Sequence, residues 1–338
     1  MGHLVITGGA GFIGANFVQW LARTEPDLEL VVVDALTYAG NLANLAPVRD
    51  RIRFERADIA DPGAMQEIVT GADGIINFAA ESHVDRSLEE AAPFLHSNVT
   101  GVQVLLDLVR RLEVPRFLQI STDEVYGSAP EGVHFDEEAR LQPSSPYAAS
   151  KAAADLLVSA AVHTWGVPAV ITRASNNYGP CQFPEKLLPL MITNIMEGLP
   201  LPVYGDGLQR REWLHVEDHC AGIWAAWQKG EPGRVYNLST GIDIANLELI
   251  RTLIGQMEAS EELITFVTDR PGHDRRYALD VTRAREELGW QPSISLPEGL
   301  ARTVSWYVEN RTWWEEIRSG EYRAYYERMY GNRDQLTE

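Results

Sequence analysis

The first 34 residues combine an apolar run, a glycine motif and an acidic residue at fixed spacing. Glycines stand at positions 8, 11 and 14, directly after the apolar run His3–Thr7 and at the start of a helical pattern. Glycine permits a tight turn and lets backbone N–H groups approach a diphosphate, while the N-terminus of the following helix supplies the positive end of a dipole. Asp34 ends the next apolar run. A carboxylate there accepts hydrogen bonds from ribose hydroxyls and repels a 2′-phosphate, so the pattern predicts a site for NAD rather than NADP.

Short apolar runs alternate with helical patterns through the first half of the chain. Strands that alternate with helices form βαβ units, and strands that are apolar throughout are covered on both faces. We therefore predict an α/β fold, with a doubly wound Rossmann-type parallel sheet in an NAD-binding domain over residues 1–178. A smaller mixed α/β substrate domain is predicted over 179–338, with some later segments returning to the first domain. The predicted strands are His3–Thr7, Leu30–Asp34, Ile52–Glu55, Gly74–Phe78, Phe117–Ser121 and Ala169–Thr172, and helices between them include Asn16–Arg23, Ala64–Val69, Val102–Leu112 and Ala148–His163.

Charge and cysteine content limit the partners of this chain. Its 29 basic and 48 acidic residues give a net charge of −19, which disfavours nucleic acid and anionic membrane surfaces. No apolar run approaches the roughly 18 residues of a membrane span. Cys181 and Cys220 are too few for a disulfide framework, which indicates a reducing compartment, and we expect a cytoplasmic protein. The histidines form no metal-ligand pattern, so no metal is predicted.

A tyrosine and a lysine four residues apart mark the first candidate catalytic group. Tyr147 and Lys151 begin a helical pattern, where this spacing places both side chains on one face. A phenol has a pKa near 10 and is a poor base at neutral pH. A nearby ammonium and a nicotinamide cation would stabilise the phenolate and lower that pKa. The pair therefore suggests a tyrosine base.

Two adjacent acids form the second candidate group. Thr122, Asp123 and Glu124 follow the strand Phe117–Ser121, at the carboxyl edge where open α/β sheets bind ligands. Close like charges push their pKa values apart, so one carboxyl group can be protonated while the other is ionised. In an extended chain the two acids face opposite ways, so both serve one substrate only if the chain turns here. The alternative is a solvated loop or a helix cap.

Together with several longer motifs, these groups resemble the dTDP-glucose 4,6-dehydratases of the extended short-chain dehydrogenase/reductase superfamily. The resemblance runs from about residue 3 to about residue 326. Its further motifs are Ala79–Ser87, Ser175–Pro180, Pro184–Leu187, Arg270–Tyr277, Trp313-Trp314 and Gly320–Tyr322.

The resemblance implies a hydro-lyase that makes dTDP-4-keto-6-deoxyglucose. Tyr147, tuned by Lys151, removes the proton of the glucose 4-hydroxyl as C4 gives hydride to NAD⁺, and Thr122 binds near that hydroxyl. The 4-keto group acidifies C5, so Glu124 takes the C5 proton while Asp123 protonates the departing 6-hydroxyl. The hydride then returns to C6, so NAD is regenerated and should stay tightly bound. This assigns the catalytic residues Thr122, Asp123, Glu124, Tyr147 and Lys151.

The resemblance also implies binding residues and a homodimer. A chain of charge −19 must gather cations to hold a sugar nucleotide, and the candidates are Lys186, Arg211, Arg270 and Arg276. The dimer would form through the helix at Gly101–Leu112 and the helix after Tyr147. Predicted cofactor-binding residues are Gly8, Gly11, Phe12, Ile13, Gly14, Asp34, Asp58, Ile59, Ala79, Tyr147 and Lys151. Predicted substrate-binding residues are Ser82, His83, Asn176, Lys186, Leu187, Arg211, Asn246, Arg270 and His273.

Some residues depart from the family pattern, and other functions stay open. Asn77 stands for a histidine, Cys181 for an aromatic residue, Glu212 for aspartate, His215 for tyrosine, and Ser239 lies near a usual glycine. The alternatives are a related dehydratase acting on a UDP-, CDP- or GDP-sugar, an NAD-dependent sugar-nucleotide 4-epimerase, and a non-catalytic NAD-binding regulator. An epimerase has no need of two acids, and a regulator has no need of catalytic groups.

Overall fold

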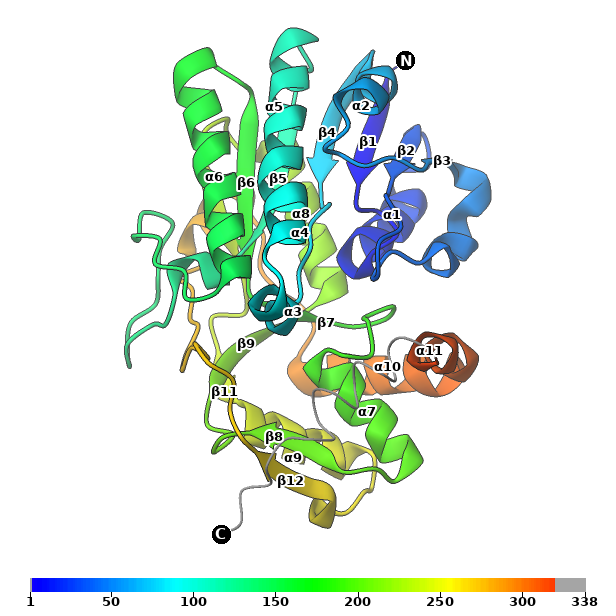
Figure 1. Ribbon diagram of the computed structural model, residues 1–338, viewed down its shortest axis with the longest axis vertical. Coiled ribbons are helices and arrows are strands. Elements are labelled where there is room, and N and C mark those ends of the chain that lie inside the picture. Colours follow the sequence, from blue (N-terminus) through cyan, green and yellow to red (C-terminus); the bar gives the residue numbers. More distant parts are fainter. Residues whose placement is uncertain (1, 320–338) are drawn as a thin grey trace.

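A seven-stranded parallel sheet forms the centre of the computed structural model, which describes residues 2–319 (Figure 1). The strand order is β10-β6-β5-β4-β1-β2-β3, so the chain reverses direction across the sheet between β1 and β4. Ligands of open α/β sheets bind at such a reversal, outside the carboxyl ends of the strands. The predicted fold class is confirmed. The strands are β1 (His3–Thr7), β2 (Leu30–Val33), β3 (Ile52–Glu55), β4 (Ala72–Asn77), β5 (Phe117–Thr122), β6 (Ala169–Ala174) and β10 (Val235–Leu238).

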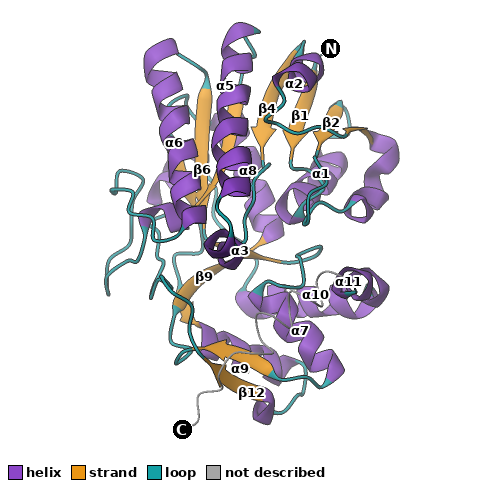
Figure 2. Cartoon of the chain, in the orientation of Figure 1, coloured by secondary structure: helices purple, strands orange, loops and turns teal. Residues whose placement is uncertain are grey.

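Helices cover both faces of this sheet, as its wholly buried strands require (Figure 2). On one face, α1 (Phe12–Thr24) and α8 (Val216–Lys229) pack with η5 (Ala284–Leu288) in one apolar cluster. On the other, α2 (Pro62–Val69), α5 (Val102–Arg111) and α6 (Pro146–Trp165) share a second cluster. Shorter helical segments connect these layers: η1 (Leu42–Arg51), α3 (Val84–Glu89), α4 (Ala92–Leu95), η2 (His96–Gly101) and η3 (Asp123–Tyr126).

A smaller lobe lies at the carboxyl ends of the sheet strands (Figure 1). It contains two small sheets, β11-β9-β7 and β12-β8. Its core includes Tyr307 and Trp314, both fully buried. Trp314 is thus a packing residue, whereas Gly320–Tyr322 lie outside the described residues. The elements are β7 (Asn176–Tyr178), α7 (Leu187–Glu197), β8 (Leu201–Tyr204), β9 (Arg210–His215), β11 (Asp243–Ala245), α9 (Asn246–Gln256), η4 (Glu261–Leu263), β12 (Ile264–Val267), α10 (Leu296–Glu309) and α11 (Arg311–Arg318).

Within residues 2–319, no helix has the length and apolar character that a membrane crossing requires. Within the same residues, histidine, cysteine and acidic side chains nowhere gather into a group of three that could hold a metal ion.

Candidate active site

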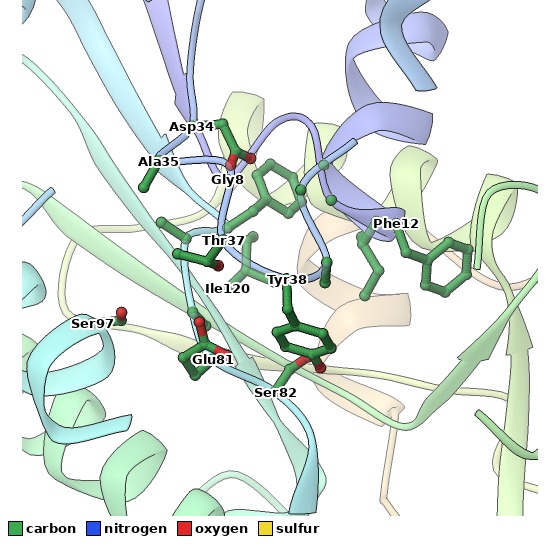
Figure 3. Close-up of a pocket in the computed structure, with 18 of the residues that line it drawn as sticks. Gly8, Phe12, Asp34, Ala35, Thr37, Tyr38, Glu81, Ser82, Ser97 and Ile120 are labelled. Atoms are coloured by element: carbon green, nitrogen blue, oxygen red, sulfur yellow. The ribbon is translucent and has the colours of Figure 1, made fainter. Parts of the chain in front are cut away.

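The first of two neighbouring pockets opens at the reversal between β1 and β4 (Figure 3). In Figure 3, Gly8 and Asp34 lie on one side of this pocket, and Tyr38, Glu81 and Ser82 lie on the other. All eleven residues predicted to bind the dinucleotide line it: Gly8, Gly11, Phe12, Ile13, Gly14, Asp34, Asp58, Ile59, Ala79, Tyr147 and Lys151.

The glycine motif folds as the sequence predicted, because close backbone contacts leave no room for side chains. Gly8 has a φ of +68°, and a Cβ there would lie 2.5 Å from the backbone nitrogen of Ala79. Gly11 is the N-cap of α1 and leaves its first N–H groups without a side-chain cap. The Asp34 carboxylate accepts hydrogen bonds from the N–H groups of Ala10 at 2.9 Å and Leu36 at 2.8 Å. Asp34 therefore orders the loop that the glycines form.

Sequence reasoning missed several side chains of this first pocket, including Thr37, Tyr38 and Ser97. Tyr38 and the Arg86 guanidinium stack, with 4.2 Å between the Arg86 Cζ atom and the Tyr38 ring centroid. The segment Thr37–Gly40 begins three residues after Asp34, and its aromatic followed by two small residues could have indicated a loop folded over a ligand.

Tyr147 and Lys151 occupy the first two turns of α6. The helix begins there because Ser145 caps it, accepting a hydrogen bond from the N–H of Ala148 at 3.1 Å, and because Pro146 suits the first turn. The Lys151 ammonium donates to the carbonyl oxygen of Ile120, at 2.7 Å. Burial lowers the pKa of Lys151 to about 8.

The chain on its own raises the pKa of Tyr147, whereas the lowering expected from the sequence required a nicotinamide cation as well as Lys151. Burial is the largest cause of a rise in this pKa, and the carboxyl groups of Glu124 and Asp123 add to it, while a hydrogen bond with Thr122 opposes it. Lys151 directs its ammonium at a backbone carbonyl of β5. Any net stabilisation of the phenolate must therefore come from charge brought by a ligand.

The two acids lie on a turn. The sequence required such a turn if both side chains were to serve one substrate. β5 ends at Thr122, whose hydroxyl caps η3 by accepting a hydrogen bond from the N–H of Glu124 at 3.3 Å. Burial, the Glu124 charge and the Glu212 charge raise the pKa of Asp123 well above its usual range. Burial also raises the pKa of Glu124, but the cations of Arg270, Lys186 and Arg211 oppose this rise. Asp123 therefore holds a proton more readily than Glu124.

A second pocket lies between Glu124 and the smaller lobe, and Lys186 lines both pockets. The Lys186 ammonium donates to the carbonyl of Ser82 at 3.0 Å. Ser82 itself lines the first pocket. The other eight residues predicted to bind substrate line the second: His83, Asn176, Lys186, Leu187, Arg211, Asn246, Arg270 and His273.

The cations of the second pocket have fixed positions. Arg270 forms an ion pair with Asp85 at 2.8 Å, and Arg211 donates to the carbonyl of Asp274 at 2.8 Å. Arg276, the fourth cation that the sequence proposed, lies elsewhere and is paired with Asp243 at 3.0 Å. Arg276 is therefore a structural residue.

Three departures from the family pattern become buried hydrogen-bonded groups. Asn77 accepts from the Thr7 hydroxyl at 2.5 Å and donates to the Gln119 side chain at 2.8 Å. Glu212 accepts a hydrogen bond from the Ser239 hydroxyl, and burial raises the pKa of Glu212 to about 7. These substitutions therefore leave the pocket linings intact.

Comparisons with known proteins agree with these pockets. The family model for GDP-mannose 4,6 dehydratase matches residues 5–303. A dTDP-glucose 4,6-dehydratase from Streptomyces griseus is 51% identical, over 93% of this chain and 97% of that protein. The structure of the dTDP-glucose 4,6-dehydratase DesIV from Streptomyces venezuelae, solved with NAD bound, has a TM-score of 0.91 and 49% identity, covering 93% of this chain and 99% of that chain.

The same fold also carries other chemistry. A UDP-glucose 4-epimerase from Thermotoga maritima, solved with UDP-glucose, has a TM-score of 0.86 at 28% identity, covering 91% of this chain and 99% of that one. Fold alone therefore does not separate dehydratases from epimerases. The identity of about half of all residues over nearly the whole length does, and by it this chain belongs to the dTDP-glucose 4,6-dehydratase family.

Proposed function

We propose that this chain is an NAD-dependent hydro-lyase that converts dTDP-glucose to dTDP-4-keto-6-deoxyglucose. The observation that carries the proposal is the buried turn η3, which holds the acids Asp123 and Glu124 beside Tyr147 in a chain about half identical to dTDP-glucose 4,6-dehydratases. A 4-epimerase needs only the tyrosine and the cofactor, so the paired acids favour dehydration over epimerisation.

The first pocket fits a dinucleotide. The uncapped N-terminus of α1 opens into it, and such helix ends bind phosphate. Asp34 lines its far side, where a carboxylate suits the ribose of NAD. NAD, when bound, accepts a hydride from C4 of the sugar and returns it to C6. We assign its binding to the eleven predicted residues, which are among those that line this pocket, and we assign binding of the sugar nucleotide mainly to residues from the second half of the chain, from position 179 on, some segments of which return to the large sheet.

The roles of the catalytic side chains follow from their surroundings. Tyr147 takes the proton of the 4-hydroxyl, Lys151 tunes it, and the positive charge of a bound nicotinamide would supply the net stabilisation of the phenolate. Thr122 binds near the same oxygen. Glu124, whose pKa rise is opposed by three cations, takes the C5 proton, and Asp123, whose pKa burial and neighbouring acids raise well above its usual range, protonates the leaving 6-hydroxyl. One carboxyl is thus the base and its neighbour the acid.

The second pocket suits a sugar nucleotide, because Lys186, Arg211 and Arg270 face it together. A diphosphate would neutralise this cluster in a chain that is otherwise strongly acidic. We place the diphosphate against Arg211 and Arg270, with the nucleotide between Leu187 and Asn246. His83, Asn176 and His273 complete the pocket, and Ser82 contacts the sugar from the first one.

We also propose a cytoplasmic homodimer. The interface would be the predicted one, formed by α5 and α6, and exposed apolar side chains stand on these helices or next to them: Leu156 on α6 is 61% exposed, and Leu95, on the short helix α4 that leads through η2 into α5, is 54% exposed. A second copy would cover these side chains. Both cysteines are free and buried, as suits a reducing compartment. Sedimentation of the wild type and of Leu156→Lys tests the dimer: the variant should sediment as a monomer, and an unchanged dimer would place the interface elsewhere.

The experiment that tests the function is turnover without added NAD. Purified protein is mixed with dTDP-glucose, and the product is followed by mass. Loss of one water, with no net reduced cofactor, supports the dehydratase and its retained NAD. Product only from UDP-, CDP- or GDP-linked glucose or mannose would change the substrate and keep the mechanism. No product from any of them, with NAD bound, would favour the non-catalytic regulator.

Two variants test which reaction step depends on the acids and which depends on the tyrosine. Glu124→Gln should turn over roughly 10²- to 10⁴-fold more slowly, because it loses a general base, and should accumulate the near-ultraviolet absorbance of reduced cofactor. Tyr147→Phe should be equally slow without that absorbance. Glu131→Gln, which changes an exposed glutamate in the loop after η3, is the matched control. Wild-type turnover by Glu124→Gln would overturn the C5-base assignment.

A further inference from the structure

Arg173 is a buried cation that lines neither pocket. It stands near the carboxyl end of β6 with 4% of its surface exposed. Its Nε donates to Oδ2 of Asp155 at 2.8 Å, and its Nη1 donates to the Tyr126 hydroxyl, also at 2.8 Å. The Arg173 Cζ atom lies 4.9 Å from the centroid of the Tyr126 ring. Arg173 therefore holds two partners at once, in fixed directions.

The two partners belong to the two elements that carry the catalytic groups. Asp155 lies on α6, four residues after Lys151 and eight after Tyr147, so all three share one side of the helix. Tyr126 is the last residue of η3, two residues after Glu124. A single guanidinium thus connects the helix of the tyrosine base to the turn of the acid pair.

The Tyr126 hydroxyl extends this connection to the far strand of the sheet. It donates to the side-chain oxygen of Asn237 on β10, at 2.9 Å. Asn237 in turn donates to the carbonyls of Phe135 and Asp280, at 3.0 and 3.1 Å. η3 is therefore anchored on one side to α6 through Arg173 and on the other to β10 through Asn237.

Stability alone does not explain why a buried ion pair of this kind is present. Removing two charges from water is costly, and well-packed apolar residues at such sites are often equally stable or more so. A planar guanidinium with several donors can, however, fix its partners in one geometry. Asp155 and Arg173 are 1% and 4% exposed, so neither charge is solvated on the surface.

We propose that Arg173 is a positioning residue that locks the Tyr147–Lys151 helix against the Asp123–Glu124 turn, so that both groups act on one sugar in a fixed pose. The proposal rests on the proposed function. That reaction requires Tyr147 to act at C4 while Glu124 and Asp123 act at the neighbouring C5 and C6, with no release in between. A misplacement of about 1 Å between catalytic groups can cost roughly 10²-fold in rate.

The test uses conservative variants and a matched control. Tyr126→Phe keeps the ring and removes the hydroxyl that Arg173 and Asn237 share. Asp155→Asn keeps the shape and removes the charge of the pair. Tyr236→Phe removes another buried tyrosine hydroxyl, one that donates to Glu287 at 3.0 Å and touches neither catalytic element. Arg173→Lys preserves the positive charge but loses the fixed geometry with which the guanidinium donates to both Asp155 and Tyr126.

The first readout is hydrogen exchange, measured on the protein without substrate. Backbone amides of residues 122–127 should exchange severalfold faster in Tyr126→Phe and Arg173→Lys than in wild type. The same amides should be unchanged in Tyr236→Phe. This readout does not depend on turnover, so it tests the lock even if the proposed substrate is wrong.

The second readout is turnover of dTDP-glucose, measured as kcat, KM and the accumulation of reduced cofactor, which shows which step of the reaction each variant slows. Tyr126→Phe should lower kcat about tenfold or more with KM within about twofold, and should accumulate reduced cofactor, because it loosens the acid pair. Asp155→Asn should lower kcat without that accumulation, because it acts on the helix of Tyr147. The kcat of Arg173→Lys should fall less than the kcat of Arg173→Met. Wild-type exchange and kcat in Tyr126→Phe would overturn the proposal, as would equal losses in Tyr126→Phe and Tyr236→Phe.

Discussion

Gly14 is a glycine of the dinucleotide motif whose substitution by alanine the structure predicts to be unfavourable. It lies inside α1, where alanine is ordinarily the better residue. A Cβ at Gly14 would lie 2.3 Å from the carbonyl oxygen of Gly8 and 2.9 Å from the Cα of Gly9. Both are backbone atoms of the loop itself, so no side-chain rotation can relieve the contact. Gly14→Ala must therefore push α1 away from the loop.

The magnitude follows from two opposed effects. Overpacking of this kind costs about 1–3 kcal/mol, and contact with rigid backbone places Gly14→Ala near the upper value. The helix propensity of alanine returns up to about 1 kcal/mol. We expect a net loss of about 2 kcal/mol. At about 2–4 °C per kcal/mol for chains of 150–250 residues, that lowers Tm by about 4–8 °C, or somewhat less in this longer chain.

Gly255→Ala is the matched control, because Gly255 also lies in a helix and a Cβ there would meet nothing within 4 Å. The assay is thermal unfolding of NAD-free protein, together with the NAD content of the protein as purified. Gly255→Ala should unfold at or slightly above the wild-type Tm and retain its NAD. Gly14→Ala should unfold earlier and carry little NAD, because the displaced loop no longer presents its N–H groups. A Tm within 1 °C of wild type with full NAD content would refute the steric argument.

Two further predictions concern cofactor retention and acid stability. The Trp313 indole N–H donates to the Asn44 side chain at 3.0 Å, and Asn44 donates to the carbonyl of Ala10 in the glycine loop at 2.9 Å. Trp313→Phe should therefore raise the Kd for NAD about two- to tenfold at unchanged kcat under saturating NAD, which titration can measure; an unchanged Kd would disconnect α11 from the loop. Burial lowers the pKa of His219 to about 3, so its contribution to stability is complete above pH ~6.5 and is lost as pH falls toward 3, by up to about 1.4 kcal/mol per pH unit. His219→Gln should flatten the fall of Tm between pH 6.5 and 4, and an unaltered slope would contradict the assignment.

Local patterns predicted six of the seven strands of the large sheet. The strand that they did not predict, β10, shows the limit of such patterns. The six predicted strands are apolar runs that alternate with helical patterns in the sequence. β10 is four residues long, contains the polar Asn237 and follows α8, a helix from the second half of the chain. Its place beside β6 depends on pairing between Val235–Leu238 and Ile171–Ala174, a contact that no local pattern encodes.

The same limit applies to charges at the site. Lys186, Arg211, Arg270 and Arg276 are equivalent as cations in the sequence, but Asp243 removes Arg276 from the pocket by pairing with it across the fold. Burial is also invisible in sequence. It raises the pKa of Tyr147 in the chain on its own, an effect that the spacing to Lys151 does not reveal. The sequence therefore predicted the positions of motifs with short, fixed spacing. It did not predict ion pairing or pKa values, which depend on residues far apart in the sequence.

The charges of the second pocket couple substrate binding to the chemistry proposed for Glu124. Lys186, Arg211 and Arg270 hold down a pKa that burial would otherwise raise further, so in the free chain these cations have Glu124 as a common counter-ion. Burial lowers the pKa values of Lys186 and Arg211, and the Arg270 charge lowers both further, so the cations also repel one another. A bound diphosphate supplies two or more negative charges to the same cluster. It relieves the repulsion, which favours binding, and it weakens the hold of the cations on Glu124. The carboxylate then becomes more basic when the sugar is in place, which is when a base is needed at C5.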